Sequence, residues 1–154
     1  MWNHDKAARN DPPEEKRAAK ECRVREGTAH AALVFEGGNC IGWCQFGTPH
    51  ELPHIHNERA YLKTNPVLPD WRITCFFSGK GYRRRGVASA ALAGALEQIS
   101  ALGGGRVEGY PEDIDGRKAS TTLVFNGVLS TFERAGFTRD RRIGDHRWVV
   151  TRKV

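Results

Sequence analysis

The sequence has no long hydrophobic run, since no stretch approaches the roughly 18 apolar residues that a membrane-spanning helix needs. Its first residues, Met1 to Lys6, lack the apolar core of a secretory signal. Cysteine is also scarce, and free thiols are expected where no export signal is present. These absences argue against a membrane protein and a disulfide-held secreted protein, and they predict a cytoplasmic location. The four cysteines are Cys22, Cys40, Cys44 and Cys75.

Signatures of nucleic-acid binding are missing as well, although the chain is basic. The 154 residues carry a net charge of +6, with a pI of about 9.4, and this favours an anionic partner. Nucleic acid, an acidic protein surface and a phosphorylated small molecule all fit the charge. No zinc finger, helix-turn-helix or aromatic-and-basic strand motif is present, so nucleic acid is the weakest of the three.

No internal repeat or low-complexity segment divides the chain, and its length suits one domain with a real core. Residues 1–27 are expected to be a loose segment and a helix that starts at Asp11-Pro12 and stops near Gly27. Residues 28–154 form the body of the domain. Its expected elements are strands at 29–35 and 40–46, a long connection at 47–70 with a helical turn near 58–63, a strand at 71–77, a helix at 88–102, a strand at 106–110, a helix at 125–135 and a hairpin of 137–143 with 146–150.

The strand–helix–strand unit at 71–110 predicts a parallel strand pair joined by a helical crossover. The hairpins on either side of it predict antiparallel pairing. We therefore expect an α/β (α+β) fold with a mixed, mostly antiparallel central sheet and helices on both faces. The strand edge at 29–35 has no predicted cover, which favours pairing of two chains as a homodimer.

The most informative segment is a basic glycine loop between the strand at 71–77 and the helix at 88–102. It reads Arg83-Arg84-Arg85-Gly86 and is followed by Val87-Ala88. The first turn of a helix presents unpaired N–H groups and partial positive charge, both of which suit phosphate oxygens. Arginine adds forked donors, and glycine lets a phosphate approach the backbone. The loop predicts an anion site, although a solvated basic loop would have the same composition.

Two common phosphate-binding motifs do not match this loop. A Walker A motif has Lys and then Ser or Thr after its last glycine, whereas Val87-Ala88 follow Gly86 here. A dinucleotide-binding fingerprint has glycines at its first, third and sixth positions. Gly79 and Gly81 fit the first two, but Arg84 stands at the sixth.

The loop instead resembles the acyl-CoA pyrophosphate loop of the GCN5-related N-acetyltransferase (GNAT) superfamily. The shared pattern is Arg83-x-x-Gly86-x-Ala88, between a strand and a helix. Asn126 and the segment Phe132-Glu133-Arg134-Ala135-Gly136-Phe137 resemble the family's Asn and its Tyr-Glu-Lys-x-Gly-Phe helix end. The resemblance covers about residues 14–154. It implies a GNAT-like fold that lacks the family's usual first strand, because residues 1–27 offer only one helix.

The resemblance implies transfer of an acetyl group from acetyl-CoA, as cosubstrate, to a primary amine that attacks the thioester directly. Main chain on the strand would contact the pantetheine arm, the loop would hold the pyrophosphate, and Asn126 would reach the arm near the thioester. A backbone N–H near Phe77 would stabilise the oxyanion. No metal is implied. The implied cosubstrate-binding residues are Phe76, Phe77, Ser78, Arg83, Arg84, Arg85, Gly86, Val87, Ala88, Ser89 and Asn126.

This chemistry needs a base, because deprotonating an amine of pKa about 10.4 at neutral pH costs about 4–5 kcal/mol. Glu108 stands where several family members carry a glutamate in this role, and a surface or salt-bridge role is an equal alternative. The family's general-acid tyrosine aligns with Phe132, which has no proton to donate. Tyr110 is the candidate substitute, with a packed aromatic as its alternative. Asn126 could equally cap a helix.

Three histidines in the long connection, His50, His54 and His56, raise the question of a metal site. Prolines and irregular spacing favour solvated side chains instead, and near an active site these histidines could bind or deprotonate the acceptor. The identity of the amine acceptor is open. A catalytically inactive acyl-CoA-binding module also fits the missing tyrosine and the short N-terminal part, and a basic nucleic-acid-binding protein is the weaker alternative.

Overall fold

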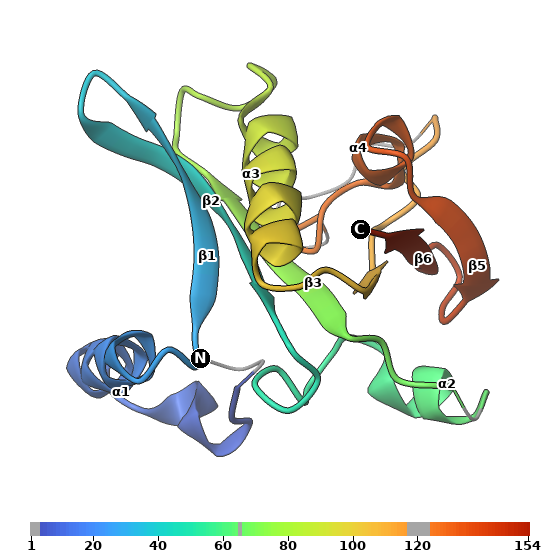
Figure 1. The fold of residues 1–154 in the computed structure, drawn as a ribbon, viewed down its shortest axis with the longest axis horizontal. Helices are drawn as coiled ribbons and strands as arrows, with labels where there is room; N and C mark the ends of the chain where they lie inside the picture. Colours follow the sequence, from blue (N-terminus) through green and yellow to red (C-terminus); the bar gives the residue numbers. More distant parts are fainter. Residues whose placement is uncertain (1–3, 65, 117–123) are drawn as a thin grey trace.

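The computed structural model describes residues 4–64, 66–116 and 124–154. They form one open sheet, with the long helix α3 lying across it between two strand hairpins (Figure 1). In chain order the elements are η1 (Ala7–Asn10), α1 (Pro13–Arg25), β1 (His30–Glu36), β2 (Asn39–Gly47), α2 (Glu58–Leu62), β3 (Trp71–Ser78), α3 (Val87–Ala101), β4 (Arg106–Gly109), α4 (Leu129–Arg134), β5 (Thr138–Arg142) and β6 (Trp148–Lys153).

The sheet has six strands in the order β1-β2-β3-β4-β6-β5. Among the strands of the described residues, β3 and β4 pair in parallel and the four other pairings are antiparallel. The parallel pair is the one that α3 connects, because a parallel connection has to cross from one end of the sheet to the other. The expected mixed, mostly antiparallel sheet is therefore confirmed.

The parallel pair separates before β3 ends. Its last paired residues are Ile73 and Gly109, yet β3 continues to Ser78, while β4 stops at Gly109. The chain that follows β4 returns beside β3, where the Phe76 N–H donates to the Phe125 carbonyl at 2.6 Å. The result is a wedge in the sheet between the second half of β3 and the chain beyond β4.

Helix α3 packs on β1, β2 and β3 through one apolar face. Its start fits closely against β2, since a Cβ at Gly42 would lie 2.4 Å from the Val87 side chain and 2.6 Å from the Phe77 carbonyl oxygen. Glycine at that position lets the first turn of α3 approach the sheet. The residues that this helix buries are Val87, Ala91, Leu92, Ala95, Leu96 and Ile99.

The two faces of the sheet are covered by different helices. Val107 belongs to the core beneath α3, and a Cβ at Gly109 would collide with Phe132 of α4. The alternate residues Glu108 and Tyr110 point to the opposite face, as the twofold period of a strand requires. Helices on both faces are thus confirmed. The cluster on the opposite face comprises Ile55, Tyr61 (of α2), Tyr110, Ile143 and Val149.

Two helix boundaries differ from expectation. The helix expected at 125–135 is only Leu129–Arg134, because Gly127 has a φ of +87° and the Phe125 carbonyl bonds to β3. The expected N-cap of α1, Asp11, ends η1, and Pro12 takes the N-cap position. Residues 4–29 contain η1 and α1 and no strand, in agreement with the missing first strand.

Candidate active site

The wedge holds a cleft of about 600 Å³, called here the β3–β4 cleft. One wall comes from the end of β3 and the start of α3, and the other from the chain around Phe125 and the first turns of α4. Sequence reasoning therefore predicted one wall of a real cavity. Among the expected residues, those that line it are Phe76, Phe77, Ser78, Arg83, Arg84, Gly86, Val87, Ala88 and Ser89.

The backbone N–H groups of β3 alternate between the cleft and β2. The Phe76 N–H points toward the cleft side, where it donates to Phe125, whereas the Gly79 N–H donates to the Ile41 carbonyl of the opposite neighbour at 2.8 Å. Because this direction alternates along a strand, the Phe77 N–H faces β2 and the Ser78 N–H faces the cleft side. The backbone N–H groups near Phe77 that face the cleft side are therefore those of Phe76 and Ser78. The Phe77 side chain, which is 49% exposed, lines the cleft.

The basic glycine loop places its backbone for an anion. Arg84 has a φ of +61° and Gly86, the N-cap of α3, a φ of +81°, so two left-handed residues alternate with residues of ordinary conformation. Such alternation turns successive N–H groups toward one concave side. No side chain caps α3, and its first intrahelical acceptor, the Gly86 carbonyl, serves Ala90. A Cβ at Gly86 would meet no atom of the described residues within 4 Å, so the space before the loop is open.

The three arginines of this loop have different surroundings. Arg83 and Arg84 line the cleft. Arg85 turns away from it, because its Nη2 pairs with Glu36 Oε1 at 2.9 Å and its guanidinium stacks over the Tyr82 ring at 5.1 Å. The structure therefore separates Arg85 from the rest of the expected site.

Asn126 is fully buried beside the cleft, between the lining residues Phe125 and Gly127. It is not a helix cap, since the N-cap of α4 is Val128. Among the described residues, neither its amide nitrogen nor its amide oxygen has a hydrogen-bond partner. Leaving such a group unpaired in the interior costs about 1–3 kcal/mol, and this suits a side chain whose partner is a ligand.

A second groove, of about 630 Å³, continues from the cleft between α3 and α4. The two cavities share Ser89, Thr131 and Arg134. Arg152 and the C-terminal Val154 also line the second groove. The continuous depression is therefore long, with cationic side chains at the loop and at the far groove.

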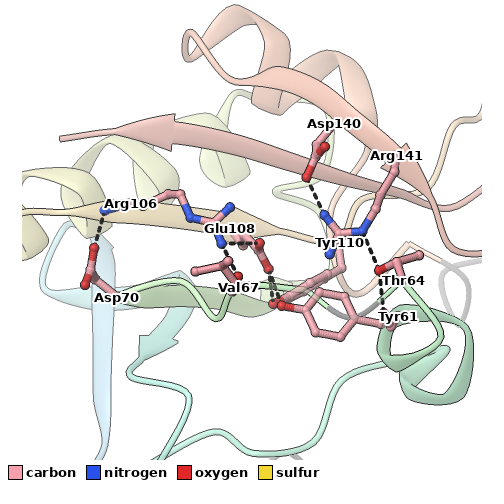
Figure 2. Close-up of polar contacts among 9 residues, drawn as sticks. All are labelled: Tyr61, Thr64, Val67, Asp70, Arg106, Glu108, Tyr110, Asp140 and Arg141. Carbon is pink, nitrogen blue, oxygen red and sulfur yellow. Dashed lines mark hydrogen bonds and ion pairs between the residues drawn. The ribbon is translucent and has the colours of Figure 1, made fainter.

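On the opposite face of the sheet, a buried polar cluster surrounds Glu108, which is 0% exposed. Glu108 Oε2 accepts hydrogen bonds from the Tyr61 hydroxyl at 2.9 Å and the Tyr110 hydroxyl at 3.1 Å. Arg106 Nη2 lies 3.1 Å from Oε1 as an ion pair, but Oε1 has no hydrogen bond within the described part of the chain. Figure 2 shows the carboxylate between these groups, which we call the Glu108 cluster: Tyr61, Arg106, Glu108 and Tyr110.

Both tyrosines of the cluster hold their protons firmly. Burial raises the pKa of Tyr110 well above its ordinary value, and Glu108 raises it further while Arg72 opposes the shift. Burial also raises the pKa of Tyr61, with a smaller contribution from Glu108. At neutral pH both hydroxyls are therefore proton donors to the carboxylate.

A family model matches most of this chain. The model of the acetyltransferase (GNAT) family matches residues 2–110, more than half of the chain. The chain belongs to the GNAT acetyltransferase family. The resemblance inferred from the glycine loop is thereby confirmed.

Solved structures share the GNAT fold at low sequence identity. A ribosomal-protein-alanine N-acetyltransferase from Brucella melitensis has a TM-score of 0.60 and 14% identity, over 94% of this chain and 80% of that one. An N-acetyltransferase from Staphylococcus aureus has a TM-score of 0.55 and 13% identity, over 95% and 78% of the two chains. An acetyltransferase from Thermus thermophilus has a TM-score of 0.54 and 14% identity, over 94% of this chain and 76% of that one. A comparison with curated proteins gave no match.

Within this GNAT fold, sequence reasoning missed Tyr61 and Arg106. Tyr61 lies in a five-residue helix inside the long connection, far along the chain from Glu108. Arg106 lies two positions before Glu108 in the strand expected at 106–110, so the twofold period of a strand could have placed it on the same face. No local pattern in the sequence marks Tyr61.

Phe132, which stands where the family's general-acid tyrosine aligns, is a core residue here. It is 0% exposed and packs edge-to-face on Phe76 and Phe137, at ring-centroid distances of 5.7 and 5.0 Å. It does not line the β3–β4 cleft. Tyr110 and Glu108 do not line it either, so the expected catalytic residues lie behind the cleft rather than on its surface.

The histidines of the long connection serve separate places in the GNAT domain. His54 pairs with Glu58, at 3.3 Å, and the His56 ring lies edge-on to Phe125 with centroids 5.3 Å apart. Burial lowers the pKa of His56, and Arg147 lowers it further. Among the described residues no group of three or more metal-ligating side chains gathers.

No described helix combines the length and apolarity needed to cross a membrane.

Proposed function

We propose that this GNAT protein transfers an acetyl group from acetyl-CoA to a primary amine by direct attack of the amine on the thioester. The observation that supports this most is the start of α3. Its first turn is uncapped, Arg84 and Gly86 give the loop before it two left-handed residues, and it borders a cleft of about 600 Å³. A helix start of this kind is suited to a diphosphate.

The residues around the cleft fit each part of acetyl-CoA. The Arg83–Ala88 loop would hold the pyrophosphate through main-chain N–H groups and the Arg83 and Arg84 side chains. The unpaired buried amide of Asn126 would bond to the pantetheine arm. The second groove, with Arg134 and Arg152, would take the nucleotide end. Arg85, engaged by Glu36, is left out of this assignment.

When bound, acetyl-CoA supplies the carbonyl carbon to which the amine nitrogen bonds as the carbon–sulfur bond breaks. The oxyanion that forms on the way needs an N–H donor in a fixed position. We assign this role to the Phe76 N–H, which faces the cleft and would exchange the Phe125 carbonyl for the oxyanion. This assignment specifies which N–H near Phe77 would act as the donor.

One proton has to leave the amine, and the departing thiolate takes up one. Glu108 is the proposed base and Tyr110 the proposed acid. Glu108 and Tyr110 are both 0% exposed and neither lines the cleft, so the amine proton would travel through water to the Tyr110 hydroxyl, which lies 3.1 Å from Oε2. Tyr110 would take the amine proton as its own moves to Oε2, and would return a proton to the thiolate. The net result is transfer from nitrogen to sulfur.

One observation favours a second function, that of an acyl-CoA-binding module without activity. Phe132 is a packed core residue without a hydroxyl, and Glu108 is held by three neighbours in a closed cluster. A carboxylate in such a cluster can be purely structural. The donor cleft would then bind acetyl-CoA while no amine reaches the base.

Two further features support proposals about assembly and location. All four cysteines are free thiols, as expected in the cytoplasm, where we place the protein.

The edge strand β1 exposes Leu33 and Phe35, which are 53% and 59% accessible, and among the described residues it has a strand on one side only. We assign this edge to a homodimer contact.

Calorimetry with acetyl-CoA and a thiol-release assay with a panel of primary amines test the function together. Binding with thiol release that depends on the amine supports the transferase. Binding without release for any amine supports the inactive module. Absence of acetyl-CoA binding would overturn both.

A further inference from the structure

The Glu108 cluster depends on a segment that is far from it in the sequence. The connection between β2 and β3 carries α2 to the face of the sheet opposite α3, where Tyr61 joins the small second core. Asn57, which precedes α2, has a φ of +58° and donates from its side chain to the Ile143 carbonyl at 2.7 Å. The position of α2 is thus fixed by contacts with distant strands.

A chain of polar contacts runs through this segment to the carboxylate (Figure 2). Arg141 Nε of β5 donates to Thr64 Oγ1 at 3.0 Å, and the Thr64 hydroxyl donates to the Tyr61 carbonyl at 2.7 Å. The Arg141 guanidinium also lies 5.0 Å from the centre of the Tyr61 ring. The Tyr61 hydroxyl then donates to Glu108 Oε2. These contacts set where the hydroxyl stands.

The geometry at Glu108 is asymmetric, and Tyr61 contributes to the asymmetry. Oε2 receives both tyrosine hydroxyls, while Oε1 faces the Arg106 guanidinium. Without the Tyr61 hydroxyl, the carboxylate could rotate to bring both oxygens toward Arg106, and Tyr110 would lose its aligned acceptor. The side chain of Tyr61 therefore selects the oxygen that Tyr110 meets.

We propose that Tyr61 is a positioning residue for the reaction, holding Glu108 Oε2 on the Tyr110 hydroxyl, and that the α2 segment thereby controls the proton path. This inference rests on the proposed function. Tyr61 acts through Glu108 and touches neither substrate. The groups that face Glu108 or Tyr61 are Arg72 on β3, Arg106 and Tyr110 at β4, Tyr61 itself on α2 and Arg141 on β5; the β6 partner of Glu108, Thr151, carries no charge.

Tyr61→Phe separates positioning from packing, because the ring that fills the second core remains. We expect kcat to fall about tenfold, KM for acetyl-CoA to stay within about twofold, and the acidic limb of the pH profile to move to higher pH. The limb moves upward because a donor to the negative carboxylate is lost. Leu62→Ala, an exposed position on the same helix, is the matched control and should match the wild type in all three.

Arg141→Gln tests the outer part of the same contact chain. It should give a smaller change in the same direction, about twofold to threefold in kcat. A Tyr61→Phe variant with unchanged kcat and pH profile would overturn the inference. So would a variant that loses activity only in proportion to its folded fraction, as measured by thermal unfolding.

A measurement without turnover keeps this inference apart from the proposed function. The chain has only three tyrosines, so tyrosinate formation can be followed by ultraviolet absorbance during an alkaline titration. Glu108→Gln should make ionisation begin at lower pH, and the change should be smaller in a Tyr61→Phe background. Equal changes in both backgrounds would disprove the Tyr61–Glu108 coupling, whereas loss of acetyl transfer in the wild type would refute only the function.

Discussion

The β3–β4 cleft and the Glu108 cluster lie next to the same strand pair but are built from different material. The proposed anion site of the cleft is made of backbone: uncapped N–H groups and two left-handed residues, one of them a glycine. The Glu108 cluster is made of side chains from α2, from β4 and from Tyr110, which directly follows β4. Tyr61, Glu108 and Tyr110 are each only 0–1% exposed. A backbone site follows from a short local sequence, whereas a side-chain cluster requires the whole fold.

The two regions also differ in which amino-acid substitutions they tolerate. A backbone site is insensitive to most side-chain changes and sensitive to those that alter φ or block the approach of a ligand. A buried polar cluster is sensitive to the loss of any one partner, because the others are left unpaired. Five substitutions, grouped in four predictions, test this contrast, from the largest expected effect on function to the smallest.

Glu108→Gln should have the largest effect and should act on turnover alone. If Glu108 is the base, kcat should fall about 10²–10⁴-fold and the acidic limb of the pH profile should disappear. The affinity for acetyl-CoA should not change, because Glu108 does not line the cleft. Steady-state kinetics and calorimetry measure the two quantities. An unaltered pH profile would remove Glu108 as the base.

Gly86→Val should act on binding alone. A β-branched residue at a φ of +81° is strained, and its side chain would occupy the open space before the loop. We expect the affinity for acetyl-CoA to fall about 100-fold, in calorimetry, with the fold preserved. Gly81→Val is the matched control, since Gly81 has a φ of +86° and equally open surroundings but does not line the cleft. Equal losses in the two variants would argue against the loop assignment.

Arg84→Ala and Arg85→Ala sharpen the assignment within the loop. Arg84 lines the cleft, and loss of a charge-assisted bond to a phosphate should weaken acetyl-CoA binding about tenfold. Arg85 is held by Glu36 and Tyr82, so its removal should change the affinity less than twofold. The reverse order of effects would show that Arg85 turns inward on binding.

Phe132→Tyr should have the smallest effect on function, because its expected effect is on stability. The Phe132 side chain is enclosed in the main core, where a hydroxyl would be buried. We expect the free energy of unfolding to fall by about 1–3 kcal/mol, in denaturant titration, with no gain in turnover. A strong gain in kcat would mean that the family's usual acid position faces the reacting sulfur in this protein as well.

Much of the fold was predictable because its signals are local. The glycines at 37–38 and 103–105 end elements, and the apolar spacing of the helix at 87–101 fixes the face that packs on the sheet. The helix at 125–135 was predicted too long, since a hydrogen bond from Phe76 to Phe125 overrides the local helical pattern. Long-range pairing of this kind leaves no trace in a short window of sequence.

Some residues of the candidate site were likewise predictable from local sequence, and others were not. The loop at 83–88 was predictable, because a phosphate-binding helix start needs glycine and donors in consecutive positions. Arg85 was not separable from Arg84 in the sequence, since only the fold brings Glu36 beside it. Tyr61 was not predictable at all, because its contact with Glu108 spans 47 positions of the chain.

The sequence by itself determined the order of strands and helices along the chain, the basic loop at the start of α3 and the resemblance to the GNAT family. These depend on spacing and on backbone conformation, which neighbouring residues control. The tertiary structure alone decided that β3 and β4 separate after Ile73, that Arg85 faces Glu36, and that Tyr61 closes over Glu108. Each of these depends on packing between distant segments, where burial and complementary charge act across the fold.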